Sequence, residues 1–274
     1  MKIRATCHAK INLFLSVGAP EPSGYHPIRT VFQSIALGDE MTVETADSET
    51  VIFSGAEVPS ENTVSKTLRL LREIHNIPPL KIQIEKLVPP ESGLGGGSAN
   101  AGKLMLIVSR IIGRPVDDFF GDVASVVGAD VPFFLTGGTA LGEGYGDRLT
   151  AEDDIPEKAV VIVRPNEGIS TGAAYAALDR TPRPFLDFPT ELPPRSPYND
   201  FERVAPCVCG EIAERLQALG SEFAMLSGSG SAVFGLFSDN ELAQKAASNL
   251  QEFGKVIVTR TATRAESLQV EQIS

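Results

Sequence analysis

The chain has 274 residues and a formal net charge of −11, with 42% hydrophobic and 22% charged residues. This composition is typical of a folded protein that forms one large domain or two of ordinary size. The negative charge and the lack of a lysine–arginine cluster in the sequence argue against a nucleic-acid partner. A small phosphorylated ligand is compatible with the negative net charge of the chain, because backbone dipoles, a few cations and a bound metal can neutralise the charge of the ligand locally.

Neither a membrane span nor a disulfide framework is expected. The longest apolar stretch, residues 104–112, is interrupted by two polar residues, and the N-terminus has no apolar run of signal-peptide length. The cysteines Cys7, Cys207 and Cys209 cannot form a disulfide framework, and the spacing of the last two completes no zinc set. We therefore expect a cytoplasmic protein without membrane contact.

The first half of the chain predicts strands with inserted helices. Apolar residues in partial alternation predict strands, with turn residues between them, over residues 10–17, 30–37, 40–45 and 80–88. Asn62 is a plausible N-cap for a helix that runs to about His75. Two further helices are expected over residues 98–112, where Gly113 stops the helix, and over residues 117–127.

The acidic segment 151–157, which ends the first half, is our predicted domain boundary, and it divides the chain into domains 1–152 and 153–274. Beyond it, strands are expected over residues 159–164, 223–226, 232–237 and 255–259. Helices are expected near residues 171–178 and 241–250, and around a run of apolar residues from Phe201 to Ile212. Because both halves mix strands and helices, the predicted fold class is α+β. The proline-rich segment 181–197 and the last dozen residues carry no recognisable motif.

The most informative stretch is a glycine-rich loop, Glu-Ser-Gly-Leu-Gly-Gly-Gly-Ser-Ala-Asn at residues 91–100, between a predicted strand and a predicted helix. Glycine lets backbone N–H groups approach a ligand closely, and the first helical turn adds unpaired N–H groups at the positive end of a dipole. This combination is typical of a phosphate site. The alternative, a flexible connector, is seldom flanked so tightly by a strand and an apolar helix.

Two common phosphate motifs do not fit this loop. Gly97 to Lys103 nearly matches the P-loop pattern G-x-x-x-x-G-K-[ST], but Leu104 lacks the hydroxyl that the pattern requires for Mg²⁺. The dinucleotide pattern G-x-G-x-x-G can be drawn from Gly93, but Ser98 stands where the third glycine belongs.

Three more segments could carry chemistry. The first is a second glycine loop, Ser-Gly-Ser-Gly-Ser at 227–231, which taken alone could be a hairpin turn. The second is Lys10-Ile-Asn-Leu, followed by Gly-Tyr-His at 24–26, where the lysine could be an exposed strand end. The third is Gly-Ala-Asp-Val-Pro-Phe-Phe at 128–134, where the aspartate could be a turn or cap residue.

Taken together, these segments resemble the GHMP kinase superfamily of small-molecule kinases, named for galactose, homoserine, mevalonate and phosphomevalonate. The segments 9–13, 24–26, 93–101, 128–134 and 227–230 carry the resemblance, in the family's order and over most of the chain. The two glycine loops mark the superfamily. The other segments indicate the branch whose acceptor is 4-diphosphocytidyl-2-C-methyl-D-erythritol.

The resemblance implies two domains, an N-terminal one like domain 2 of ribosomal protein S5 and a ferredoxin-like C-terminal one, with the active site between them. It implies an ATP- and Mg²⁺-dependent kinase that phosphorylates the 2-hydroxyl of the methylerythritol unit, in the non-mevalonate isoprenoid pathway. The implied partner is a small-molecule nucleotide substrate, and we expect a monomer or a weak homodimer.

The resemblance also implies roles for site residues. Asp130 would accept the hydroxyl proton, and Lys10 beside it would keep Asp130 ionised and stabilise developing negative charge. Tyr25 would stack on the cytosine and His26 would hydrogen-bond to its edge. Asn12 and Thr171 would contact the substrate's polar groups. The loop expected to wrap the ATP phosphates comprises Pro89, Pro90, Glu91, Ser92, Gly93, Leu94, Gly95, Gly96, Gly97, Ser98 and Ala99.

Three further residues concern the nucleotide site. Each has more than one possible role or departs from the family pattern. Ser98, at the helix start, is our candidate Mg²⁺ contact. Glu91 stands where the family commonly has smaller residues, so its side chain would point outward or help to hold Mg²⁺. Asn62 matches the region near the adenine in the family, but its N-cap role explains it equally well.

Two other functions stay open from the sequence. The first is another kinase of the superfamily, of the mevalonate or homoserine type, whose substrates have no base for Tyr25 and His26 to recognise. The second is a non-catalytic ATP-binding protein of the same fold, against which the presence of both Lys10 and Asp130 argues.

Overall fold

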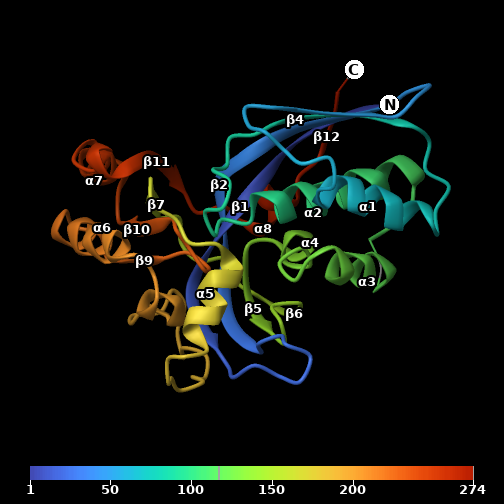
Figure 1. Cartoon of the computed structure of the whole chain (residues 1–274). Helices are drawn as coiled ribbons and strands as arrows, with labels where there is room; N and C mark the ends of the chain where they lie inside the picture. The colour runs from blue at the N-terminus through green and yellow to red at the C-terminus, as the bar shows by residue number, and fades with distance from the viewer. Residues whose placement is uncertain (117, 274) are drawn as a thin grey trace.

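Two β-sheets meet along a pair of long central strands (Figure 1), in a computed structural model that describes residues 1–116 and 118–273. The central strands are β1 (Lys2–Val17) and β2 (Ile28–Thr45), and they pair antiparallel. Burial along β1 alternates at first and then becomes continuous from Ala9 onward. The strand is therefore covered on one face near its start and on both faces beyond it.

The first sheet has eight strands within the part of the chain that the structure describes. Its order is β12–β1–β2–β4–β3, with β5 and β8 pairing beside this path and β6 pairing with β5. The bounds of the added strands are β3 (Thr50–Ser54), β4 (Leu80–Glu85), β5 (Thr139–Glu143), β6 (Arg148–Glu152), β8 (Tyr198–Asn199) and β12 (Glu271–Ile273). The helices beside this sheet (Figure 1) are α1 (Thr63–Arg72), α2 (Gly96–Ile112), α3 (Asp118–Val127), α4 (Phe133–Thr136) and α8 (Arg264–Leu268).

The helix α1 begins where the sequence predicts it. Asn62 Oδ1 accepts hydrogen bonds from the backbone N–H groups of Val64 and Ser65, and the Ser65 hydroxyl accepts from Asn62 N–H. This capping box satisfies N–H groups that the helix itself leaves unpaired. The N-cap prediction for Asn62 is confirmed.

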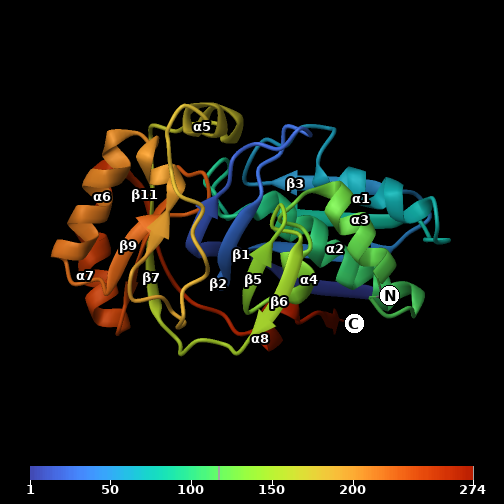
Figure 2. The ribbon, with the colours of Figure 1, turned by 90° about the horizontal axis from the view of Figure 1, so that it is seen from below.

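The second sheet has four strands, again counted over the described residues, in the order β11–β7–β10–β9 with antiparallel neighbours. Its strands are β7 (Ala159–Pro165), β9 (Phe223–Leu226), β10 (Val233–Phe237) and β11 (Gly254–Arg260). Helices α6 (Cys207–Ala218) and α7 (Asn240–Ser248) lie beside this sheet, away from β1 and β2 (Figure 2). This strand order and the chain order β7, α6, β9, β10, α7, β11 are those of a ferredoxin-like fold, as predicted.

Helix α5 (Thr171–Leu178) and two short 3₁₀ turns, η1 (Asp200–Arg203) and η2 (Gln251–Phe253), complete the elements. The predicted helix around Phe201 to Ile212 is in fact two elements, η1 and α6. Pro206 separates them, and proline has no N–H to continue a hydrogen-bonded helix.

The strand prediction missed β3, β5, β6, β8, β12 and the first eight residues of β1, and it also divided β2 in two. The sequence predicts a break between residues 37 and 40, whereas β2 continues through Gly38 and Asp39, which pair with His8 and Cys7 of β1. A Cβ on Gly38 would lie 2.7 Å from the Cys7 carbonyl oxygen, so glycine serves close strand pairing here rather than a turn. Helix α2 begins at Gly96, two residues before the predicted start at Ser98.

The two sheets share packing and chain segments. Ile11 and Leu13 of β1 lie in one buried cluster with Ile162 of β7 and Phe234 of β10. Strand β8 pairs with β1 in parallel, and β12 pairs with β1 in antiparallel, which brings the two termini side by side (Figures 1 and 2). The division into domains 1–152 and 153–274 stays a prediction, and Asp117, the first residue of a predicted helix, lies outside the described residues.

Candidate active site

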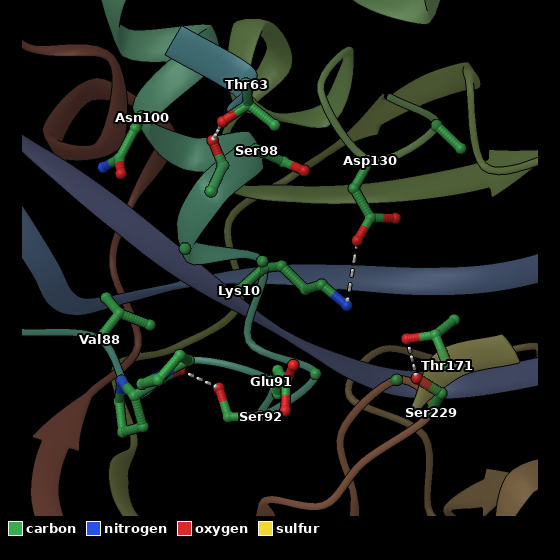
Figure 3. A pocket seen from close by; sticks show the side chains of 18 of the residues that line it. Lys10, Thr63, Val88, Glu91, Ser92, Ser98, Asn100, Asp130, Thr171 and Ser229 are labelled. Atoms are coloured by element: carbon green, nitrogen blue, oxygen red, sulfur yellow. Dashed lines mark hydrogen bonds and ion pairs between the residues drawn. The ribbon is translucent and has the colours of Figure 1, made fainter. Parts of the chain in front are cut away.

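A cavity of about 890 Å³ is lined by residues from both halves of the chain. This volume is near the upper end for small-molecule sites, as two bound substrates would require. Of the predicted site residues, the cavity lining includes Lys10, Asn12, Tyr25, His26, Asp130 and Thr171, together with the glycine loop. Residues that lie far apart in the sequence therefore converge on one site (Figure 3).

The glycine loop leads directly into α2. Gly95 is the N-cap, in the left-handed region at φ 73°, and no side chain caps the helix. Within residues 1–116 and 118–273, no hydrogen-bond acceptor is present for the backbone N–H groups of Gly95, Gly96, Gly97 and Ser98. These N–H groups stand at the positive end of the α2 dipole beside the cavity, so they are available to phosphate oxygens.

The two glycine loops touch each other. Gly93, at φ +77°, packs so closely on the second loop that an added Cβ would lie 2.0 Å from the Ser227 carbonyl oxygen. The Ser227 hydroxyl donates to the Gly93 carbonyl at 3.1 Å, and Ala232 N–H donates to the Ser92 carbonyl at 3.0 Å. The loop between β9 and β10 therefore supports the glycine loop from the second sheet.

Lys10 and Asp130 form the charged pair of the site. Lys10 Nζ lies 3.5 Å from Asp130 Oδ2 (Figure 3). It also donates to Asn12 Oδ1 at 2.7 Å. The lysine is 3% exposed, whereas the Asp130 side chain is 35% exposed toward the cavity. A buried ammonium needs such acceptors.

Local structure explains where these two side chains point. The Lys10 N–H donates to the Leu94 carbonyl at 3.0 Å, which ties β1 to the glycine loop. Asp130 lies in the turn between α3 and α4, where Val131 N–H donates to the Gly128 carbonyl at 2.9 Å. The turn leaves the carboxylate free to face Lys10.

Asn12 is held by its neighbours. Its side-chain amide donates to the Thr30 hydroxyl at 2.7 Å, and Thr30 donates to the Phe14 carbonyl at 2.8 Å. Because its Oδ1 accepts from Lys10, Asn12 is positioned to orient the lysine.

Tyr25 and His26 line the cavity beside residues from both halves of the chain. Tyr25 is 64% exposed and its ring centroid lies 5.2 Å from that of Tyr145. His26 is buried, its ring lies 4.7 Å from Tyr175, and its Nε2 lies 2.6 Å from the accepting Asp179 Oδ1. The Asp179 contact occupies one ring nitrogen of His26.

Tyr175 and Thr171, both on α5, also line the cavity. Burial, and next the negative charge of Asp130, raise the pKa of Tyr175 to about 12, so its hydroxyl stays protonated at neutral pH. The Thr171 hydroxyl is hydrogen-bonded to the Ser229 hydroxyl at 3.0 Å (Figure 3). Helix α5 and the second glycine loop therefore meet at the cavity.

Not every residue of the predicted phosphate loop presents its side chain to the cavity. Leu94 and Ala99 are 0% and 1% exposed and belong to buried apolar clusters. Apolar residues at these two positions anchor the loop in the core. Neither residue lines the cavity, and the Ala99 N–H already donates to the Gly95 carbonyl at 2.8 Å.

Sequence reasoning missed a second lysine at the site. Lys86 lines the cavity and pairs with Asp39, which is 0% exposed, and its Nζ donates to Asn100 Oδ1 at 2.9 Å. The position of Lys86 directly before the loop at 89–99 could have indicated a role at the phosphate site. Its pairing with Asp39 could not be predicted, because Asp39 is distant in sequence. Thr63 was also missed, and its hydroxyl donates to the Gly97 carbonyl at 2.6 Å.

The chain contains no complete metal cage among its described residues, since no three histidine, cysteine, aspartate or glutamate side chains converge. Ser98 and Glu91 line the cavity, and the Ser98 side chain extends from α2 on the side of Asp130 (Figure 3). Mg²⁺ in nucleotide sites is held by one or two protein groups, with phosphates and water completing the shell. These residues fit that arrangement.

Comparisons with known proteins identify the family of the chain. Residues 62–138 match the model of the GHMP kinases N terminal domain, and residues 195–256 match that of the GHMP kinases C terminal domain. In the described part of the chain, no helix is both long and apolar enough to cross a bilayer. The chain belongs to the GHMP kinases, and is thus a phosphotransferase by class.

Two relatives and one solved structure define the family more narrowly. The 4-diphosphocytidyl-2-C-methyl-D-erythritol kinase of Geobacter metallireducens is 39% identical, over 88% of this chain and 92% of the relative. That of Moorella thermoacetica is 35% identical, over 93% and 97%. A crystal structure of 4-(cytidine 5'-diphospho)-2C-methyl-D-erythritol kinase matches with a TM-score of 0.80 and 30% identity, over 94% of this chain and 99% of that one. Within the GHMP kinases, the chain is a member of the 4-diphosphocytidyl-2-C-methyl-D-erythritol kinase family.

Proposed function

We propose that the chain transfers the γ-phosphoryl group of ATP to the 2-hydroxyl of 4-diphosphocytidyl-2-C-methyl-D-erythritol, in the non-mevalonate route to isoprenoid precursors. The observation that carries this proposal is the Lys10–Asp130 pair, which lies in one cavity with the glycine loop, Tyr25 and His26. A kinase with a nucleotide-linked acceptor requires three things in one cavity: a site for the ATP phosphates, an acid–base pair for the acceptor hydroxyl, and side chains that recognise the nucleobase.

In the proposed reaction, the free N–H groups at the start of α2 hold the ATP phosphates. Asp130 accepts the proton of the acceptor hydroxyl as that oxygen attacks the γ-phosphorus. Lys10, 3.5 Å from Asp130, stabilises negative charge on the transferred group. The products are ADP and the 2-phosphate of the acceptor.

Bound Mg²⁺ would neutralise charge on the β- and γ-phosphates as the leaving group departs. Ser98 would offer a hydroxyl ligand at the start of α2, and Glu91, which lines the cavity, would offer a carboxylate directly or through water. Glu91 has φ 50°, the single positive φ among described residues other than glycine, so the backbone at this position departs from the usual range.

At the acceptor end, Tyr25 would stack on the cytosine ring and His26 would hydrogen-bond to the base edge. Because Asp179 takes His26 Nε2, the nitrogen left for the base is Nδ1. Thr171 and Asn12 would contact the polar groups of the substrate, and their placement along the cavity supports this role.

Further parts of the proposal rest on the sequence. These are a cytoplasmic location, a monomer or weak homodimer, and the domain boundary near residue 152. A small nucleotide substrate and no nucleic acid remain the expected partners, in keeping with the net charge of −11.

The test is a comparison of acceptors. The purified protein is incubated with ATP, Mg²⁺ and either the diphosphocytidyl substrate, mevalonate or homoserine, and release of ADP is measured. The proposal predicts acceptor-dependent ADP release with the diphosphocytidyl substrate alone. Turnover with only mevalonate or homoserine would show a different kinase of the superfamily, and nucleotide binding without turnover of any acceptor would show a non-catalytic protein.

A further inference from the structure

A buried carboxylate in the first sheet contacts both ends of the glycine loop. Asp39 Oδ1 accepts the backbone N–H groups of Leu87 at 2.8 Å and Val88 at 2.9 Å, just before the loop begins at Pro89. Asp39 Oδ2 accepts the side-chain amide of Asn100 at 2.9 Å, just after the loop ends, and pairs with Lys86 Nζ. One side chain thus joins the entry and the exit of the loop.

The loop has few bonds of its own to hold its shape. Pro89 and Pro90 have no N–H, and the N–H groups from Gly95 to Ser98 have no protein acceptor among the described residues. Contacts from outside must therefore fix the direction in which these N–H groups point. The second glycine loop, Lys10 and Thr63 contact the loop between its ends, and Asp39 contacts the residues at both ends.

The bonds of Asp39 are also charge-assisted and fully enclosed. The residue is 0% exposed, and four donors meet its two oxygens. Charge-assisted bonds are stronger than neutral ones, and a completed network of this kind holds its members rigidly. The pairing also keeps Lys86 against Asn100 at the cavity wall, where a Cβ on Gly96 would lie 3.6 Å from Lys86 Nζ.

We infer that Asp39 is a positioning residue for nucleotide binding, which sets the two ends of the phosphate loop through Leu87, Val88 and Asn100. Asp39 does not line the cavity, so it acts through these residues and Lys86 rather than by contact with ATP. This inference rests on the proposed kinase function. It assigns a role to a residue at which the sequence suggested only a turn.

The chain offers an exchange variant that separates charge from hydrogen bonding. In Asp39→Asn, the amide oxygen can still accept from Leu87 and Val88, but Lys86 loses its carboxylate partner. In the double variant Asp39→Asn with Asn100→Asp, the new amide donates to the new carboxylate, and Lys86 pairs with residue 100. The bond between residues 39 and 100 is then retained with its direction reversed, the Leu87 and Val88 N–H groups still donate to residue 39, and Lys86 exchanges its contact with residue 39 for the carboxylate at residue 100.

Asp200 provides a matched control. It is also 0% exposed, its Oδ2 accepts the Val17 N–H at 2.8 Å, and its Oδ1 pairs with Arg203 at 3.3 Å. The variant Asp200→Asn therefore removes a buried charge comparable to the one that Asp39→Asn removes, but at a site that does not touch the glycine loop.

The experiment measures binding of a fluorescent N-methylanthraniloyl ATP analogue with Mg²⁺, together with the KM values for ATP and for the acceptor and the melting temperature. Asp39→Asn is expected to raise the Kd of the analogue and the KM for ATP roughly tenfold, and the KM for the acceptor by less than about twofold. The exchange variant is expected to return the Kd to within about threefold of wild type. Asp200→Asn is expected to lower the melting temperature without changing the Kd.

Three results overturn the inference. One is a folded Asp39→Asn variant with wild-type affinity for the analogue. The second is an exchange variant that recovers the melting temperature but still binds the analogue as weakly as the single variant. The third is a folded exchange variant that fails to bind the analogue. This result decides the matter if Asp39→Asn itself does not fold. A wild-type protein that does not bind ATP contradicts the proposed function itself, which distinguishes the two failures.

Discussion

Gly93 is the position where the account makes its most demanding structural prediction. It lies where the two glycine loops meet, at φ +77°. In Gly93→Ala, the new methyl group would stand 2.0 Å from the Ser227 carbonyl oxygen, whereas real Cβ contacts are essentially never closer than 3.0 Å. The loops must therefore separate by about 1 Å or more, and the left-handed backbone adds about 1–2 kcal/mol of strain.

The expected effect on catalysis follows from this displacement. The N–H groups of Gly95 to Ser98, which we propose hold the ATP phosphates, would move with the loop. Misplacement of about 1 Å in a phosphoryl-transfer site can reduce the rate by about 100-fold. We therefore predict that Gly93→Ala lowers kcat/KM for ATP by about two orders of magnitude in a protein that still folds.

The assay is steady-state ADP release at varied ATP, with circular dichroism to confirm folding. The control is Gly210→Ala on the exposed face of α6, where an added Cβ meets nothing within 4 Å. This control should keep wild-type kinetics and gain up to about 1 kcal/mol in the free energy of unfolding. A Gly93→Ala protein with kcat/KM for ATP within about threefold of wild type would refute the argument that loop contact sets the phosphate site.

Three further predictions concern charged groups. Asp130→Asn should lower kcat by about 10²–10⁴-fold with the Kd for ATP nearly unchanged, because it removes the proposed base but no phosphate contact; near-wild-type kcat would exclude that role. Asp179→Asn should raise the KM for the diphosphocytidyl acceptor about tenfold and leave the KM for ATP unchanged, because His26 loses its charged partner; an equal rise in both would count against a role at the acceptor end. Burial, and next the Lys103 ammonium, lower the pKa of His8 from 6.5 to about 4. Between pH 6.5 and pH 4 the unfolded state therefore binds more protons than the folded state. The free energy of unfolding should fall by up to about 3 kcal/mol as the pH drops over this range. Urea titrations of His8→Gln should lack this contribution of His8 to the pH dependence.

The parts of the site that could be predicted from the sequence are those whose chemistry is local. Four glycines in five positions before an apolar helix predict a phosphate-binding loop without any information about tertiary contacts. Asn62 could be identified as an N-cap because a cap and its helix are neighbours in the sequence. Lys10 and Asp130 could be paired only through the family resemblance, because they lie 120 positions apart and no local pattern indicates that 3.5 Å separates their charged groups.

The parts that could not be predicted depend on contacts between distant segments. Gly38 and Asp39 resemble a turn, and only the pairing of β2 with β1 shows that the strand continues through them. The same pairing places Asp39 beneath the glycine loop, 61 positions from Asn100, to which it is bonded. The return of β12 to pair with β1 likewise leaves no local signal, because three exposed or half-buried residues make too short a strand to recognise.

The position of the new phosphate on the product shows which hydroxyl the enzyme phosphorylates and whether Asp130 is required. The purified protein is incubated with ATP, Mg²⁺ and 4-diphosphocytidyl-2-C-methyl-D-erythritol, and the product is examined by ³¹P and ¹³C NMR. The account predicts a new phosphomonoester signal coupled to the carbon that bears the 2-hydroxyl, absent in a parallel reaction with Asp130→Asn. A phosphate on any other hydroxyl, or the same product at the same rate from the Asp130→Asn protein, would contradict it.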